Sequence, residues 1–302
     1  MVLQWRLRVG NIMAFVRGCG VIWRVVAFWL LVTCCSQAVA VEPAPIRIGI
    51  TPAIVHDEYL LMMDLRQYLE RKTGRFVEFI PRNSYRETID LIKHDELDFA
   101  WVSAYPFVYL QHNFKARLVA MPVLDGRSSF RAYLIVPAAD KTTSSLLQLE
   151  GKFFAFADPY SYTGYLVPRY ELRQAGKDPR TFFAKTFFAW GHKRVVKAVA
   201  SGLADGAYVD SFVWNSLAAL EPELTAQTRI VAQTSECGSP PIVASRKVSG
   251  RDFTALRRVL LEMSADPEGF KLLKRLRIDD FVAGDPKAFA EVARIMQIMG
   301  DI

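Results

Sequence analysis

Strand patterns and helix patterns alternate along the chain from residue 46 onward. Three short apolar runs have the composition of strands: Ile46–Ile50, Phe76–Ile80 and Asp98–Val102. The segments between them, from Asp57 to Lys72 and from a cap at Asn83 or Ser84 to Lys93, carry apolar residues with helical spacing. Strands and helices in this order form a sheet with parallel strands and helices on its faces. The sequence therefore predicts an α/β fold.

The second half of the chain continues this alternation and adds two crossings between lobes. A strand at Arg131–Val136 ends at Pro137, where we expect the chain to pass into a second lobe. A later strand at Ile242–Ser245 returns to the first lobe. We therefore predict two lobes, each a mostly parallel sheet flanked by helices. The predicted boundaries are 41–136 and 238–302 for the first lobe, and 137–237 for the second.

The first 40 residues have the features of a secretory signal peptide. They contain four arginines and no acidic residue, an apolar run at Val25–Val32, and the small-residue motif Ala38-Val39-Ala40. We expect cleavage after Ala40, and Met13 is an alternative start that gives a shorter leader. Lipid attachment at Cys34 or Cys35 is a second interpretation, although the residue before Cys34 fits a lipobox poorly. The chain is therefore predicted to be exported to the periplasm.

Export changes what the composition implies. Loss of the four leader arginines lowers the formal net charge from +7 to +3, so the mature chain gives little support for nucleic-acid binding. Cys19, Cys34 and Cys35 also lie in the leader, which leaves Cys237 as the one mature cysteine. An internal disulfide and a multi-cysteine metal site are therefore excluded. We expect a monomer without a metal or cofactor.

A hydroxyl-rich turn between a strand and a helix is the clearest candidate site. The apolar run Lys152–Ala157 leads through Asp158-Pro159 to Ser161 and Thr163, at the start of a helix that ends near Gln174. The first N–H groups of a helix point outward at the positive end of its dipole, and nearby hydroxyls add donors. Such a turn can hold an anion. Ser and Thr are also ordinary N-cap residues, so a purely structural role stays open.

The order of four motifs resembles that of the phosphate/phosphite/phosphonate-binding proteins of ABC importers. These motifs are Asp158-Pro159-x-Ser161-x-Thr163-Gly164-Tyr165-Leu166-Val167-Pro168, Gly191-His192, Val209-Asp210-Ser211-Phe212-Val213-Trp214 and Pro240-Pro241-Ile242-Val243. The likeness extends from about Ile46 to the last helices. It implies a two-lobed, type II periplasmic binding protein that closes at a hinge. It also implies a binding protein rather than an enzyme.

The resemblance assigns roles to individual positions. In that family a Ser-Thr-Ser run wraps the phosphoryl oxygens, and here Ser161, Tyr162 and Thr163 stand in its place. Two of the three hydroxyls are therefore kept, while the ring of Tyr162 either walls the pocket or turns away. The family histidine falls on His192, whose ring N–H would donate to an anionic oxygen, more strongly when protonated. Tyr85 would donate its hydroxyl from the first lobe.

Other positions limit the class of ligand that the resemblance implies. Ser103 and Tyr105 would add contacts from the first lobe. A carboxylate at Asp210 would repel an oxyanion unless the ligand carries a proton, which favours a protonated phosphoryl group over sulfate. Asp210 also suits the N-cap of the following helix. Family members that take aminoalkyl phosphonates carry acidic residues where Phe212 and Pro240 stand here, so an aminophosphonate ligand is not expected.

We therefore predict a periplasmic solute-binding protein that delivers a small phosphorus oxyanion or simple phosphonate to the permease of an ABC importer. One alternative is a receptor for an oxyanion or small organic anion that serves a sensor kinase. Another is an exported enzyme on the same fold that uses Asp210 and His192, although no nucleophile with a partner is visible. Cys237 would be either a thiol ligand or a small buried filler.

Overall fold

The structure, a computed structural model, describes residues 44–51 and 59–302. The predicted signal peptide, with Met13, Cys34 and Cys35, lies outside the described residues, as does the start of the helix expected from Asp57. The chain from Pro45 to Ile302 forms a unit of its own. Within the described residues, no helix has the length and apolar character needed to cross a bilayer.

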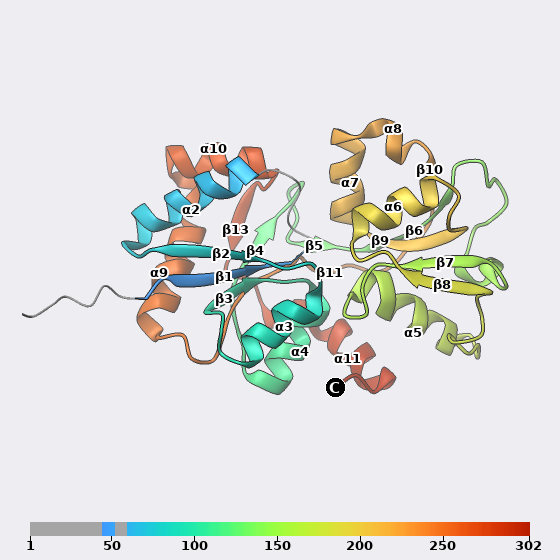
Figure 1. The fold of residues 1–302 in the computed structure, drawn as a ribbon, viewed down its shortest axis with the longest axis horizontal. Coiled ribbons are helices and arrows are strands. Elements are labelled where there is room, and N and C mark those ends of the chain that lie inside the picture. The colour runs from blue at the N-terminus through green and yellow to red at the C-terminus, as the bar shows by residue number, and fades with distance from the viewer. Residues whose placement is uncertain (1–43, 52–58) are drawn as a thin grey trace, which may run out of the picture. The chain divides into compact units, whose positions relative to one another are not determined.

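A six-stranded sheet contains the strands predicted in the first part of the chain. Its order is β13-β4-β12-β3-β1-β2 (Figure 1). These strands are β1 (Ile46–Ile50), β2 (Val77–Pro81), β3 (Phe99–Trp101), β4 (Arg117–Val123), β12 (Ile242–Ala244) and β13 (Asp280–Val282). β1 pairs in parallel with β2 and β3, whereas β12 and β13 run antiparallel to their neighbours. The predicted α/β start and the returning strand at 242 are both confirmed.

Helices cover both faces of this first sheet, because its strands are apolar on both sides. Phe99 and Trp101 pack into one apolar cluster, while Ala100 between them packs into another. The helices of the first cluster are α2 (Tyr59–Thr73), α9 (Gly250–Leu261) and α10 (Pro267–Leu276). Those of the second are α3 (Tyr85–Lys93), α4 (Ala104–Phe114) and α11 (Ala290–Met299). Figure 1 shows α2 and α10 on the face opposite α3 and α4.

A second, five-stranded sheet has the order β10-β6-β9-β7-β8. Its strands are β6 (Ala132–Pro137), β7 (Phe153–Phe156), β8 (Lys185–Phe188), β9 (Gly206–Asp210) and β10 (Thr228–Gln233). β7 is parallel to β8 and β9, and β6 is antiparallel to β9 and β10. The helices that belong to it are α5 (Val167–Gln174), α6 (His192–Ala200), α7 (Ser211–Leu220) and α8 (Pro222–Thr225). Short 3₁₀ helices of three or four residues lie at Leu146–Leu149, Met263–Ala265 and Pro286–Phe289.

One predicted boundary is wrong. The strand assigned to the end of the first lobe is β6, which pairs in the second sheet, so the chain leaves the first sheet before Ala132. Its apolar pattern predicts a strand but carries no information on which partner the strand will pair with. The residues just before it, β5 (Ser129–Phe130), pair with β11 (Cys237–Gly238) in a separate two-stranded sheet. The outgoing and returning segments therefore run antiparallel, side by side.

Two features of the first sheet's helices were not expected from the sequence. Pro106 after Ser103 suggests a turn, but it lies in the first turn of α4, where its missing N–H breaks no helical hydrogen bond.

The last helix, α11, contacts elements of both sheets. Arg294 on α11 donates to the Tyr170 hydroxyl of α5 (2.9 Å), and Arg173 of α5 donates to the Ile298 carbonyl (2.8 Å).

Candidate functional site

The hydroxyl-rich turn forms a π-helical turn, Tyr162–Leu166, that continues directly into α5. Ser161 is its N-cap, and the Ser161 Oγ accepts a hydrogen bond from the Gly164 N–H at 3.0 Å. The Leu166 N–H donates to the Ser161 carbonyl at 3.0 Å, which closes the wider π-type ring. Single π turns inside helices are often found at functional sites. Ser161 is fully buried and Thr163 is 1% exposed.

Gly164 allows this turn to lie against the end of β7 and against His192. A Cβ added at Gly164 would lie 2.4 Å from the Ala157 Cβ and 3.2 Å from the His192 Cε1. The first distance is shorter than any normal carbon–carbon contact, so a side chain here would push the turn away from the strand. The glycine of the motif is therefore explained by close packing, because its φ is not in the left-handed region.

His192 links the turn to the end of the neighbouring strand. It is the first residue of α6, and its Nε2 lies 3.3 Å from the Ser161 Oγ. Its Nδ1 accepts a hydrogen bond from the Asp210 N–H at 3.3 Å, so in the neutral ring the proton is on Nε2 and is directed at Ser161. Burial lowers the pKa of His192 to about 4. The ring is therefore neutral at pH 7, and the protonated form considered from the sequence is not present there.

Asp210 ends β9 and caps α7. Its Oδ1 accepts a hydrogen bond from the Phe212 N–H at 2.8 Å, so the capping role expected as an alternative is present. The residue is 1% exposed. Burial raises the pKa of the Asp210 carboxyl to about 7, and the hydrogen bonds from the Phe212 and Val213 N–H groups offset this rise only in part. Near neutral pH the carboxyl can therefore both hold and release a proton.

Tyr85 brings the first sheet's helix α3 to this cluster. It is the first residue of α3, after the N-cap Ser84, and its backbone N–H donates to the Asp158 Oδ2 at 3.2 Å. Its hydroxyl is buried and has no hydrogen-bond partner within the described residues. Burial raises the pKa of Tyr85 well above its usual value, and the charges of Asp158 and Asp210 raise it further. Both carboxyl groups therefore act electrostatically on this hydroxyl.

Replacing Tyr85 with phenylalanine should raise the stability of the unliganded protein, because an unpaired buried hydroxyl costs about 1–3 kcal/mol. We expect a gain of about 1 kcal/mol in the free energy of unfolding, measured with urea. Tyr208→Phe is the matched control, since the Tyr208 hydroxyl donates to Glu171 at 2.7 Å and its loss should destabilise. Destabilisation by both substitutions would show that the Tyr85 hydroxyl has a partner in solution.

Asp158 is a site residue to which the sequence analysis assigned no binding role, although it begins the first motif. It is 2% exposed, and its Oδ1 accepts the Tyr160 N–H at 2.8 Å while Oδ2 accepts the Tyr85 N–H. Burial raises the pKa of its carboxyl. The bond to Tyr160 is an Asx-type turn, for which Asp before Pro159 is a sequence signal. The bond to Tyr85 has no local signal, because the two residues are 73 positions apart.

Within the described residues, no side-chain hydrogen bond joins Tyr162, Tyr105 or Ser103 to this cluster. The Tyr162 ring packs in the apolar cluster shared with α11, with Cys237 and Glu291 among the groups that affect its pKa, which burial raises. It has therefore turned into the core. Burial raises the pKa of Tyr105, and the charge of Asp301 raises it further. Ser103 is buried at the N-cap position of α4 but makes no side-chain capping bond.

Cys237 is a buried thiol that belongs to no candidate metal site in the part of the chain that the structure describes. Cys237 is 3% exposed, and burial raises the pKa of its thiol well above the usual value, so it stays protonated at neutral pH. This fits the buried-filler interpretation. Across residues 44–51 and 59–302, no group of three or more His, Cys, Asp or Glu side chains is placed to hold a metal ion.

The fold defines a class of protein. Two mixed sheets flanked by helices are joined through antiparallel crossing segments, and polar side chains from helix and strand ends of both sheets meet in one cluster. This is the two-sheet fold of type II periplasmic binding proteins. The family model for the ABC transporter phosphonate periplasmic substrate-binding protein matches residues 48–289. The chain belongs to this family.

Several relatives resemble the chain over most of its length. The probable ABC transporter phosphite binding protein PhnD1 of Prochlorococcus marinus is 23% identical over 287 residues, 88% of this chain and 93% of that protein. Its solved structure with methylphosphonate has a TM-score of 0.76 at 20% identity and covers 85% of this chain and 98% of that one. The phosphate-import protein PhnD of Mycolicibacterium smegmatis is 25% identical over 197 residues, 59% of this chain and 61% of that protein.

Family membership confirms that the chain is a periplasmic substrate-binding protein rather than an enzyme, with an ABC transporter permease as its partner.

Proposed function

We propose that the protein binds a protonated phosphorus oxyanion or a small phosphonate in the cluster formed by Tyr85, Ser161, His192 and Asp210. The observation that carries this proposal is a buried hydroxyl without a partner together with a buried carboxyl whose pKa is raised. Within the described residues, the Tyr85 hydroxyl lacks a hydrogen-bond partner and the buried Asp210 carboxyl forms no ion pair. A phosphoryl group with one proton can accept from the first and share its proton with the second.

The charges of the cluster support a protonated ligand. His192 is neutral at pH 7, and Asp158 and Asp210 are both buried near Tyr85. A fully ionised oxyanion placed here would be repelled by these carboxylates in a low-dielectric setting. Sulfate has no proton to share near neutral pH, so the cluster should select against it. The names of the relatives, which specify phosphite, phosphate and methylphosphonate, support the same ligand class.

Burial of the cluster supports a hinge. Tyr85, Ser161, His192 and Asp210 are each at most 1% exposed, so a ligand must enter while the two sheets are apart. The paired crossing segments β5 and β11 are the natural place for that motion. Ligand bonds to Tyr85 on one side and Ser161 on the other would stabilise the closed state for the permease. We propose that the protein works as an exported monomer, processed after Ala40.

Calorimetric titration at pH 7 tests the ligand class. We expect phosphite, phosphate or methylphosphonate to bind at least about 100-fold more tightly than sulfate, because a missing proton leaves a buried carboxylate facing an anion. Aminoethylphosphonate serves as the comparison with a cationic substituent. Sulfate affinity equal to that of the tightest phosphorus compound would contradict the role of Asp210.

A further inference from the structure

A cavity of about 270 Å³ adjoins Asp210 through Phe212. Phe212, whose N–H binds the Asp210 carboxyl, is one of its lining residues. Trp101 and Pro240 line it as well, and the Trp101 Nε1 donates to the Pro240 carbonyl at 2.9 Å. This bond holds the indole ring in place. Phe212 therefore links the Asp210 cap, at the carboxyl end of β9, to the wall of the cavity.

The cavity is suited to a hydrocarbon group of several carbon atoms, since one water molecule takes about 30 Å³. Its apolar lining includes, besides Trp101 and Phe212, two residues of α2, one residue just after β4 and the last residue of α7: Leu61, Met62, Leu124 and Leu220. None of the described lining residues is acidic. An aliphatic or aromatic substituent would be stabilised here by burial, whereas an amine would find no counter-charge.

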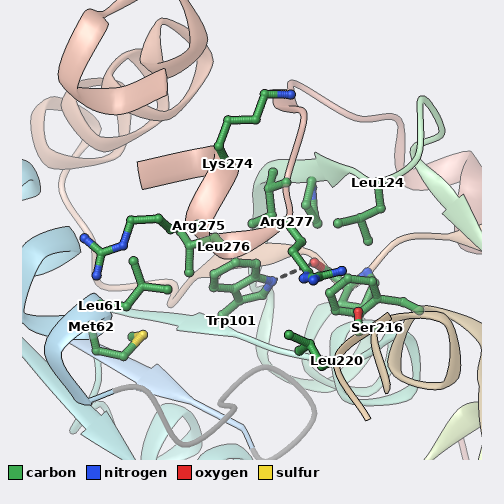
Figure 2. Close-up of a pocket in the computed structure, with 14 residues that line it drawn as sticks. Leu61, Met62, Trp101, Leu124, Ser216, Leu220, Lys274, Arg275, Leu276 and Arg277 are labelled. Atoms are coloured by element: carbon green, nitrogen blue, oxygen red, sulfur yellow. Dashed lines mark hydrogen bonds between the residues drawn. The ribbon is translucent and has the colours of Figure 1, made fainter. Parts of the chain in front are cut away.

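Three cations at the end of α10 border the cavity, but only one is directed into it. Figure 2 shows the Arg277 side chain reaching between Trp101 and Ser216, while Lys274 and Arg275 point away. Arg275 is paired with Asp64 at 2.6 Å. Arg277 has no ion pair with any described residue. A guanidinium beside apolar walls is suited to a carboxylate or phosphate, which it can bind with two parallel hydrogen bonds.

We propose that the ligand has two anionic ends separated by a hydrocarbon linker. This rests on the proposed function, because it takes the phosphoryl end to be bound by Tyr85, Ser161 and Asp210. The linker would lie between Trp101 and Phe212. The distal end, a carboxylate, would bind Arg277. The substrate class is therefore the phosphonocarboxylates and related phosphate monoesters that carry a carboxylate.

Calorimetry with matched pairs of compounds tests this class. Phosphonopropionate has a carboxylate where propylphosphonate has a methyl group. Carboxyphenylphosphonate has a carboxylate where phenylphosphonate has a ring hydrogen. In at least one pair the carboxylate compound should bind about tenfold more tightly or better, because a charge-assisted hydrogen bond is gained. Arg277→Gln should reduce this affinity ratio to near one. Arg275→Gln, which removes the same charge from the same helix end, should leave the ratio unchanged.

The outcomes separate this inference from the proposed function. If methylphosphonate binds but neither carboxylate compound exceeds its partner, the two-ended ligand is wrong and the phosphoryl site stands. If Arg275→Gln lowers the ratio as much as Arg277→Gln, the gain is a general effect of positive charge and the assignment to Arg277 is overturned. If no phosphorus compound binds the wild-type protein, the proposed function and this inference both fail.

Discussion

The Asp210→Asn variant should be more stable than the wild-type protein above pH 7, by about 2 kcal/mol. Burial raises the pKa of Asp210 from its usual value of 3.8 to about 7. The folded-state pKa therefore exceeds the unfolded-state pKa, so the stability that this group contributes is full below about pH 4 and is lost as the pH rises through 7. The difference between the two pKa values corresponds to about 4 kcal/mol. Asparagine avoids this loss and still caps α7, although an amide oxygen is a weaker acceptor.

Urea unfolding at several pH values measures this effect. The difference in unfolding free energy between Asp210→Asn and wild type should grow from pH 5 to pH 8. Asp285→Asn is the control, because Asp285 caps the turn at 286–289 through the Lys287 N–H (2.9 Å) but is exposed. That substitution should give only a small difference, because asparagine keeps an oxygen that can cap the turn. If the difference in unfolding free energy between Asp210→Asn and wild type does not change with pH, the pKa of Asp210 is not raised by burial.

The same substitution should reduce the selectivity of the protein for phosphite over sulfate. An amide can donate to an unprotonated oxygen, so sulfate should bind Asp210→Asn more tightly than it binds wild type. Phosphite should bind more weakly, and we expect the ratio of the two affinities to fall at least about tenfold. Titration at pH 7 gives both constants. The gain in stability and the loss of selectivity have one cause, since a desolvated carboxylate is unfavourable without its ligand.

Local chemistry explains which parts of this site could be predicted. Ser84, Ser161 and Asp210 each stand at a strand-to-helix junction, and each proves to be an N-cap whose bonds reach only two or three residues along the chain. The family resemblance added His192 and Tyr85, which are buried like Ser161 and Asp210. Cap positions were therefore predictable because their sequence signals and their partners are adjacent.

Contacts between distant segments could not be predicted in the same way. The Asp158 carboxylate meets the Tyr85 N–H across 73 positions, and nothing in either segment encodes that meeting. The ring of Tyr162 could have faced either side of its turn, and its packing against α11 was decided by residues more than 120 positions away. The strand β6 was recognised, but its sheet was not, since strand pairing depends on partners elsewhere in the chain.

His192 can orient a hydrogen-bond donor while its ring stays neutral. With Nδ1 of His192 accepting the Asp210 N–H, the ring can give its one proton to Ser161 without carrying a charge. The Ser161 Oγ already accepts this proton and the Gly164 N–H, so its own hydroxyl hydrogen is free to point at a ligand. The ring thus orients a donor rather than supplying a positive charge. Recognition would then depend on hydrogen-bond direction and on the shared proton at Asp210.

Replacing both Ser161 and Thr163 with alanine is expected to weaken phosphite or methylphosphonate binding by at least about 100-fold, because two hydrogen bonds to a charged group are lost. Unfolding should stay cooperative and lose about 1–2 kcal/mol, since the N-cap of the π turn disappears and His192 loses its acceptor. Calorimetry and urea unfolding on the same preparation separate the two effects.

The matched control for this double variant is Ser249→Ala, which removes a cap of the same kind. Ser249 accepts the Asp252 N–H at 3.0 Å at the start of α9, and it is exposed on the first sheet's side of the molecule. Its loss should cost about 1 kcal/mol of stability with the same ligand affinity as wild type. Unchanged affinity in the double variant would show that the turn at Ser161 is only a helix cap. Equal weakening in both variants would show that affinity follows overall stability, because the two caps share nothing else.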